Sequence, residues 1–249
     1  MNTKTIVLYK FFTLLVFACL ATSCDKDSKC LKTSGTNITE ERLVNQSFES
    51  IELNSKINLI ITQDSITSLK VEAGSNLMPM ISTDVLNNQL IIKSDNKCSF
   101  LRSYTKPINV YLSTPNLKKI SYKGNGDITS TNVLNFPNLY IESDGGTGSV
   151  NLALVSEQLN IQQHNGPADF NLIGFVKELY VYTLGTGWIF LDNLNAQTAH
   201  VSSNGTGDVT VNATNTLRVE LRYIGNVNYY GNPVLSVTEH SGSGKIVKK

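Results

Sequence analysis

Residues 139–152 read LYIESDGGTGSVNL, and the same pattern returns at 179–191 (LYVYTLGTGWIFL) and 199–211 (AHVSSNGTGDVTV). Each copy holds one aliphatic residue, a Gly-rich corner and a second aliphatic residue. The first aliphatic positions lie 21, 20, 20, 20, 18 and 18 residues apart, at Ile120, Ile141, Ile161, Val181, Val201, Val219 and Val237. The second positions are Ile128, Val150, Phe170, Ile189, Val209, Val227 and Ile246. A sustained period of this length predicts a repeat architecture.

Within each unit, apolar and polar residues alternate, as is typical of strands with one buried face. Leu139 and Ile141 are therefore expected to point inward and Tyr140 outward, and Leu235 with Val237 inward in the last unit. No unit can bury its apolar face alone, so the units must stack. The sequence predicts an all-β fold, a parallel β-solenoid with rungs of about 20 residues.

Five corners carry the motif Gly-x-Gly, at residues 124–126, 146–148, 185–187, 205–207 and 242–244. Glycine is expected there for two reasons. A sharp turn favours positive φ, which glycine adopts without steric cost. Corners of the same shape can also stack closely when they carry no side chains. A phosphate-binding glycine loop would need a following helix, and each corner is followed by a strand instead.

Residues 43–249 are expected to form a single domain, because the period is unbroken from residue 116 onward. The part from 43 to 115 also alternates, at 48–53, 57–61, 69–71, 90–92 and 108–112, but lacks the Gly corners. We interpret it as the first rungs and a cap, since a terminal repeat must shield exposed core and strand edges.

The N-terminus has the features of an exported protein. Residues 1–23 form a signal peptide, with Lys4 and Lys10 before an apolar stretch too short to span a bilayer. The small residues before Cys24 resemble a bacterial lipobox, which implies lipid attachment at Cys24 and anchoring in a Gram-negative outer membrane. The surface and periplasmic faces both stay open. An ordinary cleaved signal is the alternative. The polar segment 24–42 is expected to be a flexible tether.

Two cysteines remain after signal removal and lipidation, Cys30 and Cys98. In an oxidising compartment they could pair. A core of this size does not need a disulfide, and Cys30 lies in the predicted tether. Whether the two cysteines pair is left open.

Residues 139–152, 179–191 and 199–211, together with 48–53, resemble the putative auto-transporter adhesin head GIN domain family. The resemblance covers nearly all of residues 43–249. It implies a right-handed parallel β-solenoid on exported or lipid-anchored bacterial proteins, and it transfers no catalytic residues. The sequence departs from the family pattern at 166–169 and 224–226, where one corner glycine is missing, so local distortion is expected there.

Carboxylates of the repeat are poorly placed for glycoside hydrolysis, which needs two of them about 5 to 10 Å apart. Glu142 and Glu220 are expected four rungs apart, roughly 19 Å at strand spacing. Asp127 and Asp208 each lie two rungs from Asp169, near the limit of reach. A polysaccharide-degrading enzyme is therefore only a distant alternative.

His164, His200 and His240 fall on separate rungs without a close Asp or Ser partner, so a catalytic triad is unsupported. The sequence has neither CxxC nor Cys/His zinc spacing, and neither a metal nor a cofactor is expected. With 21 basic and 20 acidic residues, the chain also lacks the charge of a nucleic-acid-binding protein. We predict a non-enzymatic protein.

Stacking predicts an outward column of Tyr140, Asn160, Tyr180 and His200, with Tyr182 in the next column. Aromatic faces beside amides suit sugar rings, so these five residues are candidate ligand-binding residues. Tyrosine is also simply a good strand residue.

Trp188 and Phe190 flank the inward Ile189 and are a candidate interaction patch for a protein partner or a second copy. Two functions remain open: a binding or adhesion module for a polysaccharide or protein, and a self-assembling envelope protein.

Overall fold

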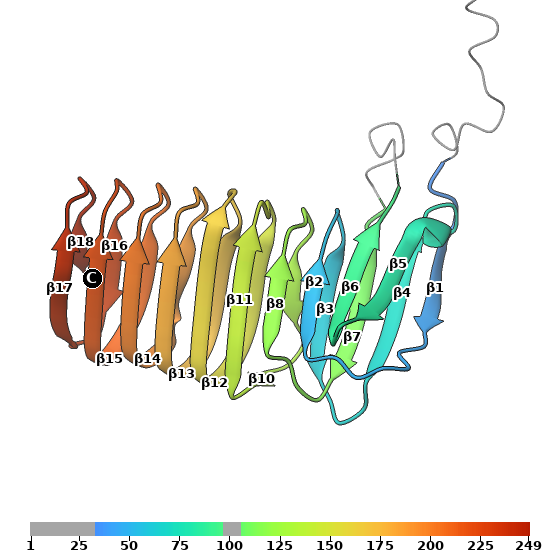
Figure 1. The fold of residues 1–249 in the computed structure, drawn as a ribbon, viewed down its shortest axis with the longest axis horizontal. Coiled ribbons are helices and arrows are strands. Elements are labelled where there is room, and N and C mark those ends of the chain that lie inside the picture. The colour runs from blue at the N-terminus through green and yellow to red at the C-terminus, as the bar shows by residue number, and fades with distance from the viewer. Residues whose placement is uncertain (1–32, 97–105) are drawn as a thin grey trace, which may run out of the picture.

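Strand pairing reproduces the spacing of the repeat. Ile120, Ile141, Ile161, Val181, Val201, Val219 and Val237 are direct register partners from one rung to the next. All of these pairings are parallel. The computed structural model describes residues 33–96 and 106–249, and these residues form one elongated stack of rungs (Figure 1). The predicted all-β parallel solenoid is therefore confirmed.

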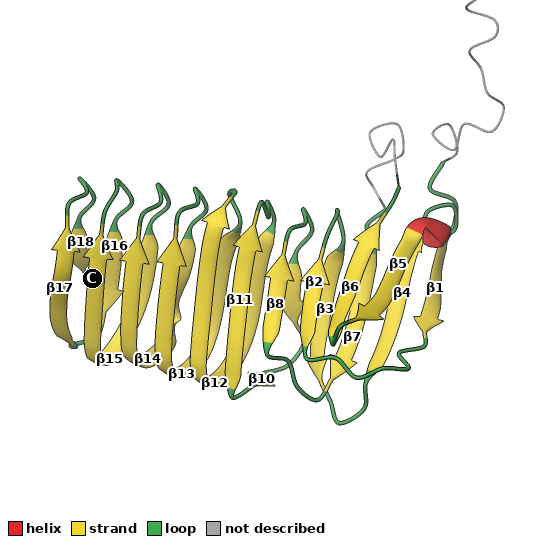
Figure 2. Cartoon of the chain, viewed as in Figure 1, coloured by secondary structure: helices red, strands yellow, loops and turns green. Residues whose placement is uncertain are grey.

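Each rung passes down one sheet and back up the other (Figure 2). We call the sheet with β8, β11 and β17 the first sheet, and the sheet with β9, β16 and β18 the second sheet. The strands β12 to β15 run through both. The repeat strands are β8 (Lys119–Tyr122), β9 (Ile128–Ser130), β10 (Leu134–Asn135), β11 (Asn138–Asp144), β12 (Ser149–Asn165), β13 (Asp169–Thr183), β14 (Ile189–Ser203), β15 (Val209–Leu221), β16 (Val227–Tyr230), β17 (Val234–His240) and β18 (Ile246–Lys248).

The core lies between the two sheets and consists of the predicted inward columns. Leu139 and Ile141 are buried, and the equivalent pairs are buried through Leu217 and Val219. The second column is buried as far as Val227. One inward column is polar and lies next to the corners. In it, Thr183 donates to Gln163 over 2.5 Å, and Gln163 donates to the carbonyl of Ala168 over 2.6 Å. These bonds pair the buried side chains of Gln163 and Thr183, whereas the hydroxyls of Ser143 and Ser203 in the same column have no partner among the described residues.

At the N-terminal end, the order of the strands along the stack differs from their order in the sequence. It comprises β1 (Asn37–Arg42), β2 (Ser50–Leu53), β3 (Asn58–Gln63), β4 (Ser68–Gly74), the 3-10 helix η2 (Met78–Met80), β5 (Ile81–Leu86), β6 (Gln89–Ser94) and β7 (Asn109–Thr114). The strand β2 lies between β6 and β8, and β3 lies between β7 and β9. A later segment therefore stacks outside an earlier one. The strands β1, β4 and β5 then close the end with antiparallel pairings.

Folded structure begins earlier than the sequence indicated. Residues 24–42 were expected to be a flexible tether, but Asn37–Arg42 is strand β1, which pairs with β4. Alternation there is weak because β1 is an edge strand with an exposed row of polar side chains. Cys24, Cys30, Cys98 and the signal peptide lie outside the described residues. Across 33–96 and 106–249, no helix has the length and apolar character needed to cross a membrane.

The corner glycines are required for space rather than for positive φ. No glycine of the five Gly-x-Gly corners has positive φ, so that part of the expectation is wrong. A Cβ at Gly207 would overlap the carbonyl of Gly187 in the rung beside it, and one at Gly205 would overlap the carbonyl of Gly185. The backbone ladder also continues through the two corners that lack one glycine, with Thr186 N to Gly166 O at 3.1 Å and Gly225 N to Gly205 O at 3.2 Å.

The last rung does not bury its inward residues. Leu235 is 39% exposed and Val237 is 45% exposed, against the prediction that both face a closed core. Their register partners Leu217 and Val219 are buried. The difference arises because β17 pairs with β15 on one side, and no described strand lies on its other side.

Candidate functional site

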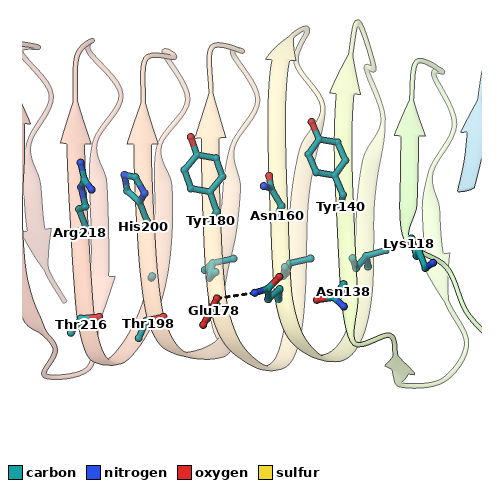
Figure 3. Close-up of a pocket in the computed structure, with 15 residues that line it drawn as sticks. Lys118, Asn138, Tyr140, Asn160, Glu178, Tyr180, Thr198, His200, Thr216 and Arg218 are labelled. Carbon is teal, nitrogen blue, oxygen red and sulfur yellow. Dashed lines mark hydrogen bonds between the residues drawn. The ribbon is translucent and has the colours of Figure 1, made fainter. Parts of the chain in front are cut away.

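A groove of about 610 Å³ runs across the first sheet, along the axis of the solenoid. Its upper row in Figure 3 is Tyr140, Asn160, Tyr180, His200 and Arg218, one residue from each successive rung. The pairing of β11 through β15 holds these residues in direct register. Four of the five candidate ligand-binding residues therefore lie in one groove.

Tyr182 lies outside the groove, although it is on the same strand as Tyr180. Its ring packs against His164, with 6.1 Å between ring centroids. It belongs to the neighbouring column of Gln162 and Ser202. The prediction grouped Tyr182 with Tyr180 because both point outward. The groove, however, follows the column of Tyr180 and the side chains on its other flank.

That other flank is a second row of polar residues, which the sequence analysis did not single out. The row is Asn138, Gln158, Glu178, Thr198 and Thr216, and Lys118 also lines the groove at the Asn138 end. Gln158 donates to Glu178 over 3.1 Å. A signal was present for all of them except Lys118: they stand two positions before the outward column of Tyr140 and therefore also point outward. The groove thus combines an aromatic row with a row of hydrogen-bonding groups.

The aromatic rings are held by neighbours from adjacent rungs. Tyr180 and His200 meet edge to face with centroids 5.1 Å apart. The Nζ atom of Lys119 lies 5.1 Å from the ring centroid of Tyr140. A cation over the ring and an edge-to-face partner each add a modest stabilisation. The groove walls are therefore set by contacts between rungs rather than by single side chains.

Asn160 lies between the two tyrosines and has an unsatisfied acceptor. Its Oδ1 atom is buried and has no hydrogen-bond partner among the described residues. Leaving a buried acceptor unpaired costs about 1–3 kcal/mol. The atom has almost no solvent-accessible surface, so a donor on a ligand would pair with it only after the side chain rotates toward the groove. Desolvation and the nearby Glu142 raise the pKa of Tyr140 to about 12, so its hydroxyl stays protonated at neutral pH.

Acidic residues beside the groove are neutralised by partners within the chain. Glu142 accepts from Ser121 at 2.7 Å and pairs with Lys119 at 2.9 Å. Burial alone would raise the pKa of Glu142, but the hydrogen bonds from Ser121 and Lys119 outweigh burial, so the pKa lies below its usual value. The Glu142 carboxylate is therefore ionised and already bound at neutral pH.

Glu220 is the centre of the second cluster. It contacts Arg218 and Arg222 at 2.8 Å each, and His200 Nε2 at 3.2 Å. Burial would raise the pKa of Glu220, while hydrogen bonds from Arg222 and His200 lower it further than burial raises it. The sequence analysis found no close Asp or Ser partner for His200; in the structure its Nε2 lies beside the Glu220 carboxylate, which the sequence analysis did not link to it. Glu142 and Glu220 lie four rungs apart in the register, as predicted.

The recurring aspartates have a structural role at the start of the second sheet. Asp127 accepts the backbone N–H of Ser149 at 3.0 Å, Asp169 that of Trp188 at 2.7 Å, and Asp208 that of Asn226 at 2.8 Å. Each carboxylate thus satisfies the first N–H of the following rung. This role accounts for their recurrence after corners. In the part of the chain that the structure describes, no three His, Cys, Asp or Glu residues are grouped to hold a metal.

Trp188 and Phe190 are exposed on the second sheet, as predicted, with Ile189 buried between them. Their rings meet edge to face at 5.9 Å. Three further exposed apolar side chains, Val155, Ile173 and Phe175, come from the adjoining parts of β12 and β13. The sequence analysis missed these three because they lie near the bend between the sheets, where the alternation is less regular.

Comparison with known proteins agrees with this architecture. The family model described as "Putative auto-transporter adhesin, head GIN domain" matches residues 47–233. A crystal structure of a putative adhesin from Bacteroides fragilis is 31% identical with a TM-score of 0.77, covering 86% of this chain and 97% of that one.

Two structures from Parabacteroides distasonis share the fold. One is named a putative adhesin, with 18% identity, a TM-score of 0.62, and coverage of 86% of this chain and 98% of that one. The other is named a putative lipid binding protein, with 20% identity, a TM-score of 0.59, and coverage of 86% and 97%. Among curated proteins, none matches the chain. By the span of the family model and the identity to the Bacteroides structure, the chain belongs to the putative auto-transporter adhesin, head GIN domain family.

Proposed function

We propose that this chain is a non-enzymatic binding module of the cell envelope, anchored by lipid at Cys24, whose groove binds an extended polysaccharide. The observation that carries the proposal is the row Tyr140, Asn160 and Tyr180, in which two rings flank an amide with an unpaired acceptor. Membership of an adhesin family favours a role at the cell surface.

The spacing of the two rings suits a chain of sugars. Tyr140 and Tyr180 are two rungs apart, which is roughly 10 Å at the spacing of adjacent strands. This separation is comparable with a disaccharide unit in an extended glycan. Sugar rings pack their C–H faces on aromatic side chains, and their hydroxyls bond to amides and carboxylates. The row from Asn138 to Thr216 supplies such groups along the same line. The ligand would therefore lie parallel to the solenoid axis.

A binding role fits the state of the polar residues better than catalysis. Glu142 and Glu220 are neutralised by basic neighbours, and the aspartates serve as backbone acceptors. A general acid would instead need a raised pKa, and both of these glutamates have a lowered one.

The test compares two tyrosines on one strand. We expect Tyr180→Ser to reduce binding of a polysaccharide at least about tenfold, because it removes a ring from the groove. Tyr182→Ser is the matched control, since it removes an equally placed ring outside the groove. The measurement is a glycan array with the full chain in detergent, followed by titration with the best glycan. Equal losses in both variants, or no glycan bound by the wild type, would contradict the proposal.

Self-association through the second sheet is the second candidate function. It is favoured by the contacting rings of Trp188 and Phe190, with Ile173 and Phe175 also exposed on the neighbouring β13, because exposed apolar side chains often mark interfaces. Under this alternative, Trp188→Ser shifts an oligomer toward monomer in sedimentation and leaves glycan binding unchanged. An oligomer that survives the substitution would exclude this surface.

A further inference from the structure

The two ends of the solenoid are finished differently (Figure 1). At the N-terminal end, the edge strand β1 carries Glu40, Glu41 and Arg42, with ion pairs from Arg42 to Glu40 at 3.0 Å and from Lys70 to Glu41 at 3.2 Å. Charged, antiparallel edge strands discourage further pairing. At the C-terminal end, Val234 to Thr238 on β17 bear no charge, and all are exposed.

The C-terminal end also presents free backbone groups on both sheets. β17 pairs with β15, and β18 pairs with β16, so one side of each strand has no described partner. Leu235 and Val237 are exposed between these edges, although they continue the buried columns of Leu217 and Val219. The end face is thus an apolar core section between two open strand edges.

We infer that a second copy of this chain covers the end, with β17 of each copy pairing antiparallel to β18 of the other. A single peptide strand could cover only one of the two edges. A second copy related by a two-fold axis parallel to the strands covers both at once. Because β17 and β18 run in opposite directions along the rung, this axis brings them together antiparallel (Figure 2). In such a contact both copies use the same surface, so the assembly is complete as a dimer.

A second two-fold arrangement would pair β17 with β17 and β18 with β18 of the other copy. Charge favours the crossed pairing over this one. The segment around β18 holds Lys245, Lys248 and Lys249, whereas β17 holds Glu239. Crossed pairing places the basic segment of each copy beside the acidic one of its partner. Pairing β18 with its own copy would instead bring six lysines together, which is unfavourable at close range. Within its own chain, Lys248 Nζ donates to Asn232 Oδ1 at 2.6 Å, and Arg222 Nε pairs with the Glu239 carboxylate at 2.6 Å.

The test is sedimentation of the full chain in detergent over a wide range of concentration. We expect a dimer, and we expect Val237→Lys to weaken it at least about tenfold by placing a charge in the interface. Leu184→Lys is the matched control, because Leu184 is 48% exposed, close to the 45% of Val237, and lies at a corner in the middle of the stack. It should leave the dimer intact. Melting curves of both variants verify that they fold.

A second variant tests the crossed geometry and does not depend on Val237→Lys folding. Lys245→Glu changes an exposed side chain and should also weaken the dimer, because it replaces attraction to the partner's Glu239 with repulsion. A wild type that stays monomeric, a dimer lost in Leu184→Lys but kept in Val237→Lys, or a dimer unchanged by Lys245→Glu would overturn the inference. None of these results depends on whether the groove binds a glycan.

Discussion

Gly207→Val is expected to destabilise the solenoid by at least about 3 kcal/mol, at the upper end of what overpacking costs. A Cβ at residue 207 would overlap the carbonyl oxygen and carbon of Gly187. These are backbone atoms, so they cannot rotate away as a side chain would. The neighbouring rung must shift, and this breaks the bond of Thr206 N to Gly185 O, now 3.0 Å. Chemical denaturation measures the loss.

Asparagine substitutions separate lack of space from backbone strain. Gly145 has φ of +80° but leaves open room for a Cβ. Asparagine tolerates positive φ, so Gly145→Asn should cost less than about 1 kcal/mol. Gly207→Asn should cost nearly as much as the valine. If Gly145→Asn were the more harmful change, conformation rather than stacking would be the reason for glycine at the corners.

Cys24→Ala is expected to abolish incorporation of a labelled fatty acid and the lipid-dependent association with the membrane. The reason is chemical, because the thiol of a lipobox cysteine accepts the lipid and alanine has no nucleophile. Metabolic labelling and cell fractionation measure the two effects.

Cys30→Ala is the control for this experiment. Cys30 lies six residues further along the same segment and should leave labelling and fractionation unchanged. Equal labelling of wild type and Cys24→Ala would mean that the signal is an ordinary secretory one. Loss of labelling in Cys30→Ala instead would mean that the lipid is attached at Cys30 and not at Cys24.

The stacked columns could be predicted from the sequence because one residue per rung recurs at a nearly constant interval. Ile141, Ile161 and Val181 lie in register because parallel pairing preserves sequence offset. The same arithmetic predicted that Tyr140 and Tyr180 share a column. Position along a repeat is thus a strong predictor of position in space.

Other features depend on contacts that a period does not encode. The insertion of β2 between β6 and β8 joins residues far apart in sequence. Whether Leu235 is buried depends on what lies beyond it, which its own alternation does not reveal. The groove includes Tyr180 but not Tyr182, because its depth depends on the side chains of both flanks.

The continuous column from Ile120 to Val237 has an evolutionary consequence. Each rung contributes one residue to this column and stacks between its two neighbours, so duplication or deletion of one whole rung would leave the column continuous. The groove on the first sheet would then lengthen or shorten in steps of roughly 4.8 Å, the spacing of adjacent strands. Under the proposed function, a change in rung number alone would fit the groove to a longer or shorter ligand, without redesigning a contact within a rung.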